Sequence, residues 1–236
     1  MTDFTAIVLA GGKGTRLRSI VADRPKVLAR VGGRPFLTYL LDQLKAAGAR
    51  RVVLSTGHLA EQFADEIGDD YLGLPIAYAH EESPLGTGGA IRFAGQLVES
   101  EHLIAMNGDS YFDADLRKFM ELHLENGSDA SLLLARVPDA SRYGAVELDE
   151  DERVVAFLEK RSDLGPGLIN AGVYALRREL LKRLPEGPSS FEKDVMPVWL
   201  RELHVRGAAV ETPFIDIGVP EDYRRSHEFM ERITRG

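Results

Sequence analysis

Apolar and polar residues alternate with two different periods along the first 137 residues. Short apolar runs, which are typical of buried strands, are followed by longer segments with apolar residues three and four positions apart, which are typical of amphipathic helices. The predicted strands are 7–10, 51–55, 76–80, 103–106 and 131–137, and the predicted helices are 35–47, 59–67, 87–97 and 115–125. This alternation predicts an α/β fold with a mostly parallel central sheet and helices on both faces.

The pattern changes after Pro138. Two short alternating segments, 143–148 and 154–159, flank an acidic turn at 149–152 and predict an antiparallel hairpin. A strand at 168–176 and helices at 190–200 and 220–232 complete the predicted elements. No linker rich in Pro, Gly or Ser interrupts the chain, and no internal repeat is found. Residues 1–236 are therefore predicted to form a single domain.

The composition limits the kinds of partner. The 236 residues include 29 Lys and Arg against 37 Asp and Glu, which gives a net charge of −8. A general nucleic-acid binder needs a basic face, so nucleic acid is not an expected partner. The chain has no cysteine, no secretory signal at its start and no apolar run long enough to cross a membrane. We expect a cytoplasmic protein without disulfides, thiolate metal ligands or membrane contact.

A glycine-rich loop follows the first predicted strand. The sequence Leu-Ala-Gly-Gly-Lys-Gly-Thr-Arg-Leu occupies 9–17, and Arg-Pro-Lys occupies 24–26. Glycines let backbone N–H groups approach phosphate oxygens, and nearby cations neutralise phosphate charge. The spacing fits neither the Walker A loop nor the dinucleotide fingerprint, because Leu17 stands where the fingerprint needs its third glycine. The loop therefore predicts a pocket for a small polyphosphate, with five local cations: Lys13, Arg16, Arg18, Arg24 and Lys26.

The combination of Gly-Gly-x-Gly-Thr-Arg-Leu with the later Pro-Lys resembles the signature of nucleotidyltransferases that join a sugar 1-phosphate to a nucleoside triphosphate. The resemblance extends from Thr5 to about Arg225. It implies a Rossmann-like nucleotidyltransferase fold with a nucleotide-binding part at about 1–137, a small antiparallel sugar-binding part at about 138–219 and a C-terminal helix at 220–234. Members of this family are often dimeric, so a homodimer is a candidate assembly.

In the reaction that the resemblance implies, an oxygen of the sugar phosphate attacks the α-phosphorus of the triphosphate, and pyrophosphate leaves. The attacking phosphate is ionised near neutral pH, so catalysis needs positioning and positive charge rather than a general base. The resemblance implies that Arg16 grips the triphosphate and the leaving pyrophosphate, and that Lys26 bridges the α-phosphate and the sugar phosphate. The plain alternative for each residue is an ordinary surface cation.

Asp109 and Asp216 are the candidate metal ligands. Asp109 ends a predicted strand in Met-Asn-Gly-Asp-Ser, and parallel sheets bind ligands at the carboxyl ends of their strands. Asp216 stands in Phe-Ile-Asp-Ile-Gly, a setting in which relatives place their second metal-binding aspartate. Because hard carboxylate oxygens suit Mg²⁺, the expected cofactor is Mg²⁺, and Asp109 is the third expected catalytic residue.

The resemblance also implies which residues contact the two substrates. Segment 84–90 resembles the part of the family that lies along the base and ribose, with the N–H groups of a helix starting at Thr87 pointing into the site. The implied nucleotide-binding residues are Leu9, Ala10, Gly11, Gly12, Gly14, Thr15, Arg16, Pro84, Gly86, Thr87 and Gly108. The implied sugar-phosphate-binding residues are Lys26, Tyr143, Gly144, Glu159, Lys160 and Asn170.

Segments 84–91 and 190–194 resemble guanylyltransferases that use mannose or heptose 1-phosphate. They imply GTP and D-glycero-D-manno-heptose 1-phosphate as substrates, in the synthesis of cell-surface glycans such as lipopolysaccharide or S-layer glycan. The alternatives are a mannose-1-phosphate guanylyltransferase, a uridylyl- or thymidylyltransferase acting on glucose or N-acetylmuramate 1-phosphate, and an enzyme that makes CDP-choline. Outside the enzymes, the alternative is a non-catalytic sugar-nucleotide sensor on the same fold.

Overall fold

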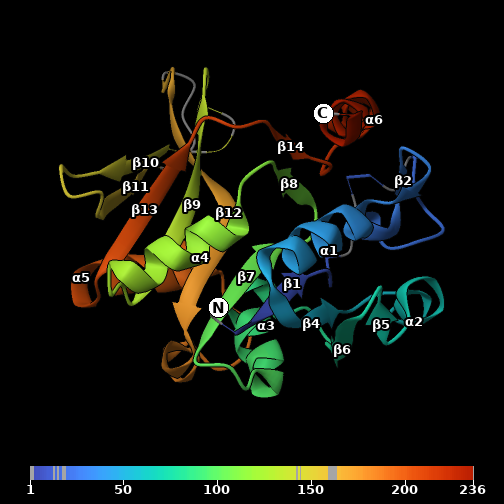
Figure 1. Ribbon diagram of the computed structural model, residues 1–236, viewed down its shortest axis with the longest axis horizontal. Coiled ribbons are helices and arrows are strands. Elements are labelled where there is room, and N and C mark those ends of the chain that lie inside the picture. The colour runs from blue at the N-terminus through green and yellow to red at the C-terminus, as the bar shows by residue number, and fades with distance from the viewer. Residues whose placement is uncertain are drawn as a thin grey trace.

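An eight-stranded sheet runs through the protein in the order β13-β9-β12-β7-β1-β4-β6-β5 (Figure 1). The computed structural model describes residues 3–12, 14, 16, 17, 20–141, 143, 145–158 and 164–235. The strands of the sheet are β1 (Phe4–Leu9), β4 (Ala49–Thr56), β5 (Asp70–Tyr71), β6 (Leu74–His80), β7 (His102–Asn107), β9 (Ala130–Val137), β12 (Gly167–Arg177) and β13 (Val205–Val210). Neighbours pair in parallel except where β12 meets β7 and β9 and where β5 meets β6. The predicted mostly parallel sheet is confirmed.

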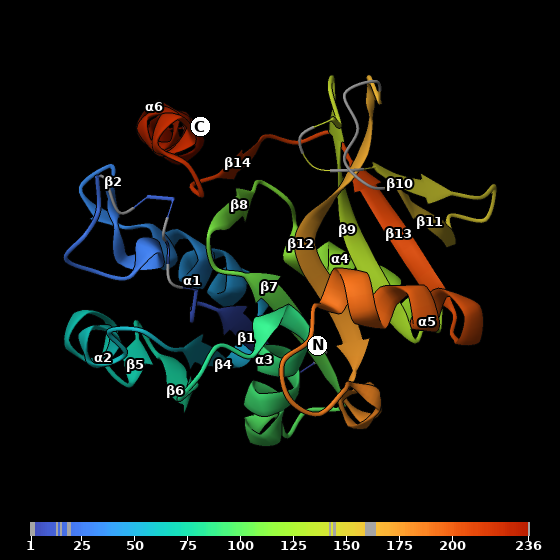
Figure 2. The same cartoon turned by 180° about the vertical axis from the view of Figure 1, so that it is seen from behind.

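Helices cover both faces of the sheet, as predicted. On one face lie α1 (Phe36–Ala47), α2 (Glu61–Ile67) and α4 (Leu116–Glu125), with α6 (Pro220–Arg235) beyond α1 (Figure 1). On the other face lie α3 (Gly86–Ala94) and α5 (Met196–Glu202), which Figure 2 shows from behind. Successive side chains of β1 point to opposite faces of the sheet. Ala6 and Val8 pack on the side of α1, whereas Ile7 packs on the side of α3. Because both faces of β1 are covered, its residues 6–9 are all apolar, and this continuous apolar run is the pattern by which the strand was predicted from the sequence.

Three two-stranded ladders stand outside the main sheet. They pair β2 (Arg30–Val31) with β3 (Arg34–Pro35), β8 (Ser110–Phe112) with β14 (Phe214–Asp216), and β10 (Ala145–Leu148) with β11 (Val154–Leu158). All three are antiparallel, and β10–β11 is the predicted hairpin around the acidic turn. Short 3₁₀ turns occupy Lys26–Leu28, Gly95–Leu97 and Arg178–Arg183. The antiparallel portion predicted for the second half is therefore present.

The structure differs from the predictions in several elements, among them β13 and the start of α5. Strand β13 was not predicted, because Val-Arg-Gly-Ala-Ala-Val has weak strand propensity and its pairing with β9 is set by residues far away in the chain. Its Gly207 is required by packing: a Cβ there would lie 2.6 Å from the side chain of Leu148 in the β10–β11 hairpin. The predicted helix at 190–200 begins with a π-helical turn, Phe191–Val195, before α5 starts.

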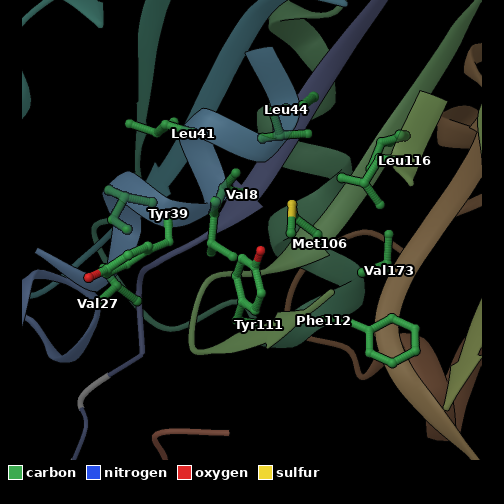
Figure 3. Close-up of a cluster of buried hydrophobic side chains, with 14 of the residues drawn as sticks. Val8, Val27, Tyr39, Leu41, Leu44, Met106, Tyr111, Phe112, Leu116 and Val173 are labelled. Carbon is green, nitrogen blue, oxygen red and sulfur yellow. The ribbon is translucent and has the colours of Figure 1, made fainter. Parts of the chain in front are cut away.

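The core beneath α1 fixes the carboxyl ends of the central strands (Figure 3). Val8 of β1, Met106 of β7 and Val173 of β12 are each at most 3% exposed and share one hydrophobic cluster. Leu44 of α1 and Leu116 of α4 close the cluster from above (Figure 3). Interiors of this kind are close-packed and yield little to strain. The loops that follow β1 and β7 therefore leave from a rigid base.

His123 of α4 is buried against β9 at the other end of the sheet. It is 1% exposed; its Nδ1 lies 2.9 Å from Ser131 Oγ, and its Nε2 lies 3.2 Å from His102 Nδ1. Burial lowers the pKa of His123 to about 4, and the charges of His102 and Arg177 lower it further in the same direction. The imidazole is therefore neutral in the folded protein. In that part of the chain that the structure describes, no helix is both long and apolar enough to cross a membrane.

We expect stability to fall as the pH drops through the window between the unfolded and folded pKa values of His123. An unfolded histidine takes up its proton near pH 6.5, whereas the folded one does so near 4, so stability is full above 6.5 and declines below it. Linkage gives a loss of about 2 kcal/mol between pH 7.5 and pH 5. Urea unfolding at both pH values measures this loss. A His123→Gln variant that loses as much stability as the parent between the two pH values would contradict it.

Candidate functional site

A cavity of about 320 Å³ opens at the carboxyl ends of β1, β7 and β6. This is the edge at which open α/β sheets bind their ligands. The cavity is lined by Leu9, Ala10, Gly11, Gly12, Lys26, Val27, Glu81, Pro84, Gly86, Thr87, Ala90, Asn107 and Asp109. The structure thus brings nine of the sequence-predicted site residues to one hollow.

Lys26 and Asp109 meet at the mouth of this cavity. The Lys26 ammonium forms an ion pair with Asp109, although 83 residues separate them in the chain. Lys26 begins a 3₁₀ turn whose next residues, Val27 and Leu28, are buried, so the backbone that carries the lysine is anchored. Its side chain is only 13% exposed. Partial burial makes this charge pair stronger than an ordinary surface ion pair.

Asp216 lies beside Asp109 because strands β8 and β14 pair. Asp216 stands opposite Ser110, and the Ile217 N–H donates to the Asp109 carbonyl oxygen at 2.9 Å. Burial raises the pKa of Asp216, and the negative charge of Asp109 raises it further. The Gly218 N–H, which donates to Asp216 Oδ1 at 2.5 Å, acts in the opposite direction, as do the charges of Lys26 and Arg16.

This pair of carboxylates fits a divalent cation. Both offer hard oxygen ligands, and a bound cation would reduce the electrostatic repulsion between the two carboxylates. Among the described residues, no group of three or more His, Asp or Glu side chains is placed to hold a metal. Two protein carboxylates with further ligands from water and substrate phosphate are the arrangement that Mg²⁺ favours.

Arg16 is exposed on the glycine-rich loop, close enough for its charge to act on Asp216. Gly14 of the same loop has a positive φ of 55°, and a Cβ there would lie 3.3 Å from the Lys26 Cβ. The two cation-bearing segments therefore lie against each other, as the phosphate-pocket prediction requires. Arg24 is partly neutralised, because its guanidinium pairs with Asp23 at 2.8 Å.

Close backbone approach explains two of the glycines in the site. A Cβ on Gly11 would lie 2.7 Å from Glu81 Oε1, and a Cβ on Gly108 would lie 2.6 Å from the Leu9 carbonyl oxygen. The Gly108 N–H donates to that same carbonyl at 2.9 Å, which ties the loop after β7 to the end of β1. Asp109 follows immediately, so this contact sets its position.

The first turn of α3 presents free backbone donors to the cavity. Gly86 and Thr87 are the first two residues of the helix, and both line the cavity. The N–H groups of the next two residues, Gly88 and Gly89, donate instead to the Ser189 carbonyl oxygen. Of the residues that the structure describes, none offers an acceptor to the N–H of Gly86 or Thr87, as expected at a helix N-terminus. The helix begins one residue before the predicted start at Thr87.

Glu81 is a site residue that the sequence did not single out. It follows β6, is 9% exposed, and lines the cavity. Its Oε1 accepts from Ser55 Oγ at 2.8 Å and its Oε2 accepts from the Leu85 N–H at 3.0 Å, which leaves acceptor capacity on both oxygens. A carboxylate directly after a parallel strand is the signal that identified Asp109, and the same signal was available here.

Two predicted sugar-contacting residues lie outside the cavity lining. Asn170 of β12 donates from Nδ2 to Tyr174 Oη at 2.8 Å and accepts from the Gly172 N–H at 2.9 Å. Tyr143 packs edge-on against Phe214, with ring centroids 5.9 Å apart. The predicted residues Thr15, Gly144, Glu159 and Lys160, and the loop cations Lys13 and Arg18, lie outside the described residues.

The family model described as "Nucleotidyl transferase" matches residues 5–233, and the chain belongs to this family. It is 39% identical over 228 residues to the D-glycero-alpha-D-manno-heptose 1-phosphate guanylyltransferase of Aneurinibacillus thermoaerophilus, with 96% of this chain and 98% of the relative covered. It is 41% identical over 231 residues to the mannose-1-phosphate guanylyltransferase of Mycobacterium tuberculosis, covering 96% of this chain and 64% of that longer relative.

Solved structures give the same picture. The crystal structure of HddC from Yersinia pseudotuberculosis superposes with a TM-score of 0.85 at 36% identity, covering 96% of this chain and 99% of that one. The same protein complexed with GMP-PN superposes with a TM-score of 0.84, also at 36% identity and with the same coverage. The nucleotidyltransferase fold predicted from the glycine-rich loop is confirmed.

We expect Gly11→Ala to destabilise the protein and Gly12→Ala to leave it intact. The new methyl at Gly11 would push Glu81 off Ser55, whereas a Cβ on Gly12 meets nothing within 4 Å. Loss of a buried hydrogen bond of this kind costs about 1–3 kcal/mol. Chemical denaturation of both variants measures the difference. Equal free energies of unfolding for the two variants would show that Glu81 is not held as described.

Proposed function

We propose that the protein transfers a guanylyl group from GTP to a sugar 1-phosphate, giving a GDP-sugar and pyrophosphate. The observation that carries this proposal is the cluster of Lys26, Asp109 and Asp216 at the edge of the phosphate loop. It occurs in a chain that matches a heptose 1-phosphate guanylyltransferase along nearly the full length of both proteins. The proposed acceptor is D-glycero-D-manno-heptose 1-phosphate. Mannose 1-phosphate is the second candidate, because a mannose-1-phosphate guanylyltransferase is 41% identical.

The chemistry needs no base. An oxygen of the sugar phosphate forms a bond to the α-phosphorus, the bond from that phosphorus to the bridging oxygen breaks, and the electron pair leaves with pyrophosphate. Two polyanions must approach each other, so positioning and preorganised positive charge are the main catalytic needs. Lys26, at the cavity mouth, is assigned to the α-phosphate and the incoming sugar phosphate. Arg16, on the exposed loop, is assigned to the triphosphate and the leaving pyrophosphate.

Asp109 and Asp216 would hold the Mg²⁺ ion that this reaction requires. Bound there, the ion would supply charge neutralisation at the phosphates. The raised pKa of Asp216 supports this assignment, because a cation would remove the repulsion between the two carboxylates. Lys26 pairs with Asp109, so binding of a phosphate would give Lys26 a competing anionic partner.

The donors and acceptors of the cavity favour guanine. The guanine edge carries the O6 acceptor, then the N1–H donor and the N2 donors. The cavity offers the N–H groups of Gly86 and Thr87 as donors and the Glu81 carboxylate as an acceptor. Uracil and thymine present a second carbonyl oxygen in place of the N2 donors, and that oxygen would face a carboxylate. A site built on such hydrogen bonds rejects the wrong partner because its buried groups are left unpaired.

The sugar phosphate is assigned to the second half of the chain. Tyr143, Gly144, Glu159, Lys160 and Asn170 are the proposed contacts, with Lys160 directed to the phosphate. We place the reaction in the cytoplasm, where nucleoside triphosphates are made, and its product in the assembly of cell-surface glycans. We also propose that the chain divides into a nucleotide-binding part, a sugar-binding part and a C-terminal helix, and that the protein forms a homodimer.

A panel of triphosphates and sugar phosphates tests this function. We expect pyrophosphate release with GTP to exceed that with UTP, CTP or dTTP by about 10²-fold or more in kcat/KM. A chelator should abolish release, and added Mg²⁺ should restore it. Glu81→Gln should narrow the preference for GTP over UTP, whereas the matched change at the exposed neighbour, Glu82→Gln, should not. A clear preference for UTP in equal-concentration competition would overturn the guanylyl assignment while leaving the family intact.

We expect Arg16→Ala and Lys26→Ala each to lower kcat by about 10²-fold or more. Removing a donor aimed at transition-state charge costs roughly 2.7–4 kcal/mol in comparable enzymes. Arg30→Ala is the control, because that guanidinium is exposed and pairs with Glu66. Steady-state kinetics at saturating substrate, with thermal unfolding to verify the fold, give the answer. Near-parental turnover in either variant would remove that residue from the catalytic machinery.

A further inference from the structure

The segment before α5 is bonded to the N-terminal turn of α3, although about 100 residues separate them. The Ser189 carbonyl oxygen accepts from the N–H of Gly88 at 2.8 Å, and the Ser189 N–H donates to the Leu85 carbonyl oxygen at 2.8 Å. A Cβ on Gly86, whose φ is 69°, would lie 2.5 Å from the same Ser189 oxygen. The glycines of this turn therefore serve the contact with segment 187–192 as well as the nucleotide cavity. The sequence predicted only the second role.

Glu192 is the centre of this contact. Its Oε2 accepts from Thr87 Oγ1 at 2.9 Å and from Ser190 Oγ at 3.0 Å, and its Oε1 accepts from Tyr174 Oη at 2.9 Å. The Thr87 hydroxyl is held from both sides, because it also accepts from the Phe191 N–H at 2.8 Å. Thr87 thus has one rotamer that satisfies its neighbours, and the turn that carries it has a fixed orientation.

The same carboxylate reaches the opposite part of the protein through Tyr174. This tyrosine of β12 is fully buried, packs against the Phe191 ring at an interplanar angle of 56° with ring centroids 4.6 Å apart, and accepts from Asn170 Nδ2 at 2.8 Å. The half-buried Glu192 carboxylate accepts from three hydroxyl groups, and partial burial of a charged group costs free energy that an apolar side chain in its place would not cost. What the carboxylate provides is a fixed orientation of the groups that it binds.

We propose that Glu192 is a positioning residue for nucleotide binding: through the Thr87 hydroxyl it holds the N–H groups of Gly86 and Thr87 at the cavity, and through Tyr174 it ties them to β12. The inference rests on the proposed function for the identity of the nucleotide. Contacts of these N–H groups to the base are the same in the ground state and the transition state. Their misplacement should therefore raise KM and Kd for the nucleotide and leave kcat nearly unchanged.

Glu192→Gln tests this directly, because it keeps the shape and replaces an acceptor oxygen with a donor group. We expect the Kd for GTP, measured by calorimetry without turnover, to rise about tenfold, and kcat to change less than threefold. Thr87→Val, which removes only the hydroxyl, should give a similar rise. The double variant should be no worse than either single variant, since both remove one contact. The matched control is Glu186→Gln, whose carboxylate pairs with Arg92 farther along α3.

Each outcome decides the matter. A lower kcat with an unchanged Kd, or additive losses in the double variant, would overturn the positioning role. The same holds if Glu186→Gln raises Kd as much as Glu192→Gln. If Glu192→Gln fails to fold, the Kd of Thr87→Val alone decides, because that variant leaves the carboxylate and Tyr174 bonded. If the parent binds no GTP, the proposed function fails, and the same variants are then compared with the triphosphate that the parent does bind.

Discussion

The placement of two carboxylates side by side is the constraint on which the rest of the site depends. Asp109 and Asp216 repel each other, and burial of Asp216 adds to the cost, as its raised pKa records. The β8–β14 ladder and the bond from the Ile217 N–H to the Asp109 carbonyl oxygen hold the two together despite this repulsion. Lys26, fixed by the buried turn that follows it, offsets part of the charge. Binding of a cation and phosphates, as proposed above, would improve the charge balance of this site.

Such a site needs a rigid base, and the sheet supplies it at the strand ends. The loops carrying Gly11 and Asp109 leave β1 and β7 directly above the cluster around Val8 and Met106. The Gly108 N–H then ties the second loop to Leu9. Because backbone contacts this close admit no Cβ, the glycines are part of the geometry that sets distances between charges. The proposed phosphate and metal binding would thus both depend on one packing arrangement.

Sequence patterns predicted those elements whose structure is determined by residues close together in the chain. Apolar runs identified the central strands, and the glycine-rich loop at 9–17 identified the nucleotidyltransferase fold, because each of these signals lies within a short stretch of the chain. Phosphate binding by this loop and Lys26 stays a prediction. Strand β13 and the β8–β14 ladder escaped prediction, since their pairing partners lie far away in the chain. Glu81 and Glu192 escaped for a related reason. Glu81 directly follows a predicted strand and Glu192 lies in the segment 190–194, but the sequence does not show the partners that the fold brings to each of them.

The antiparallel insertion of β12 gives the two halves of the chain a common framework. This strand lies between β7 and β9, so residues of the second half lie in the same sheet as the strand that precedes Asp109. Gly172 of β12 has a φ of 73° and lies against Asn107, which lines the nucleotide cavity. Two residues earlier, Asn170 begins the hydrogen-bonded path through Tyr174 and Glu192 to Thr87. A displacement of β12 would therefore reach the cavity lining by two routes, one through the contact of Gly172 with the Asn107 side chain and one through the half-buried Glu192 carboxylate.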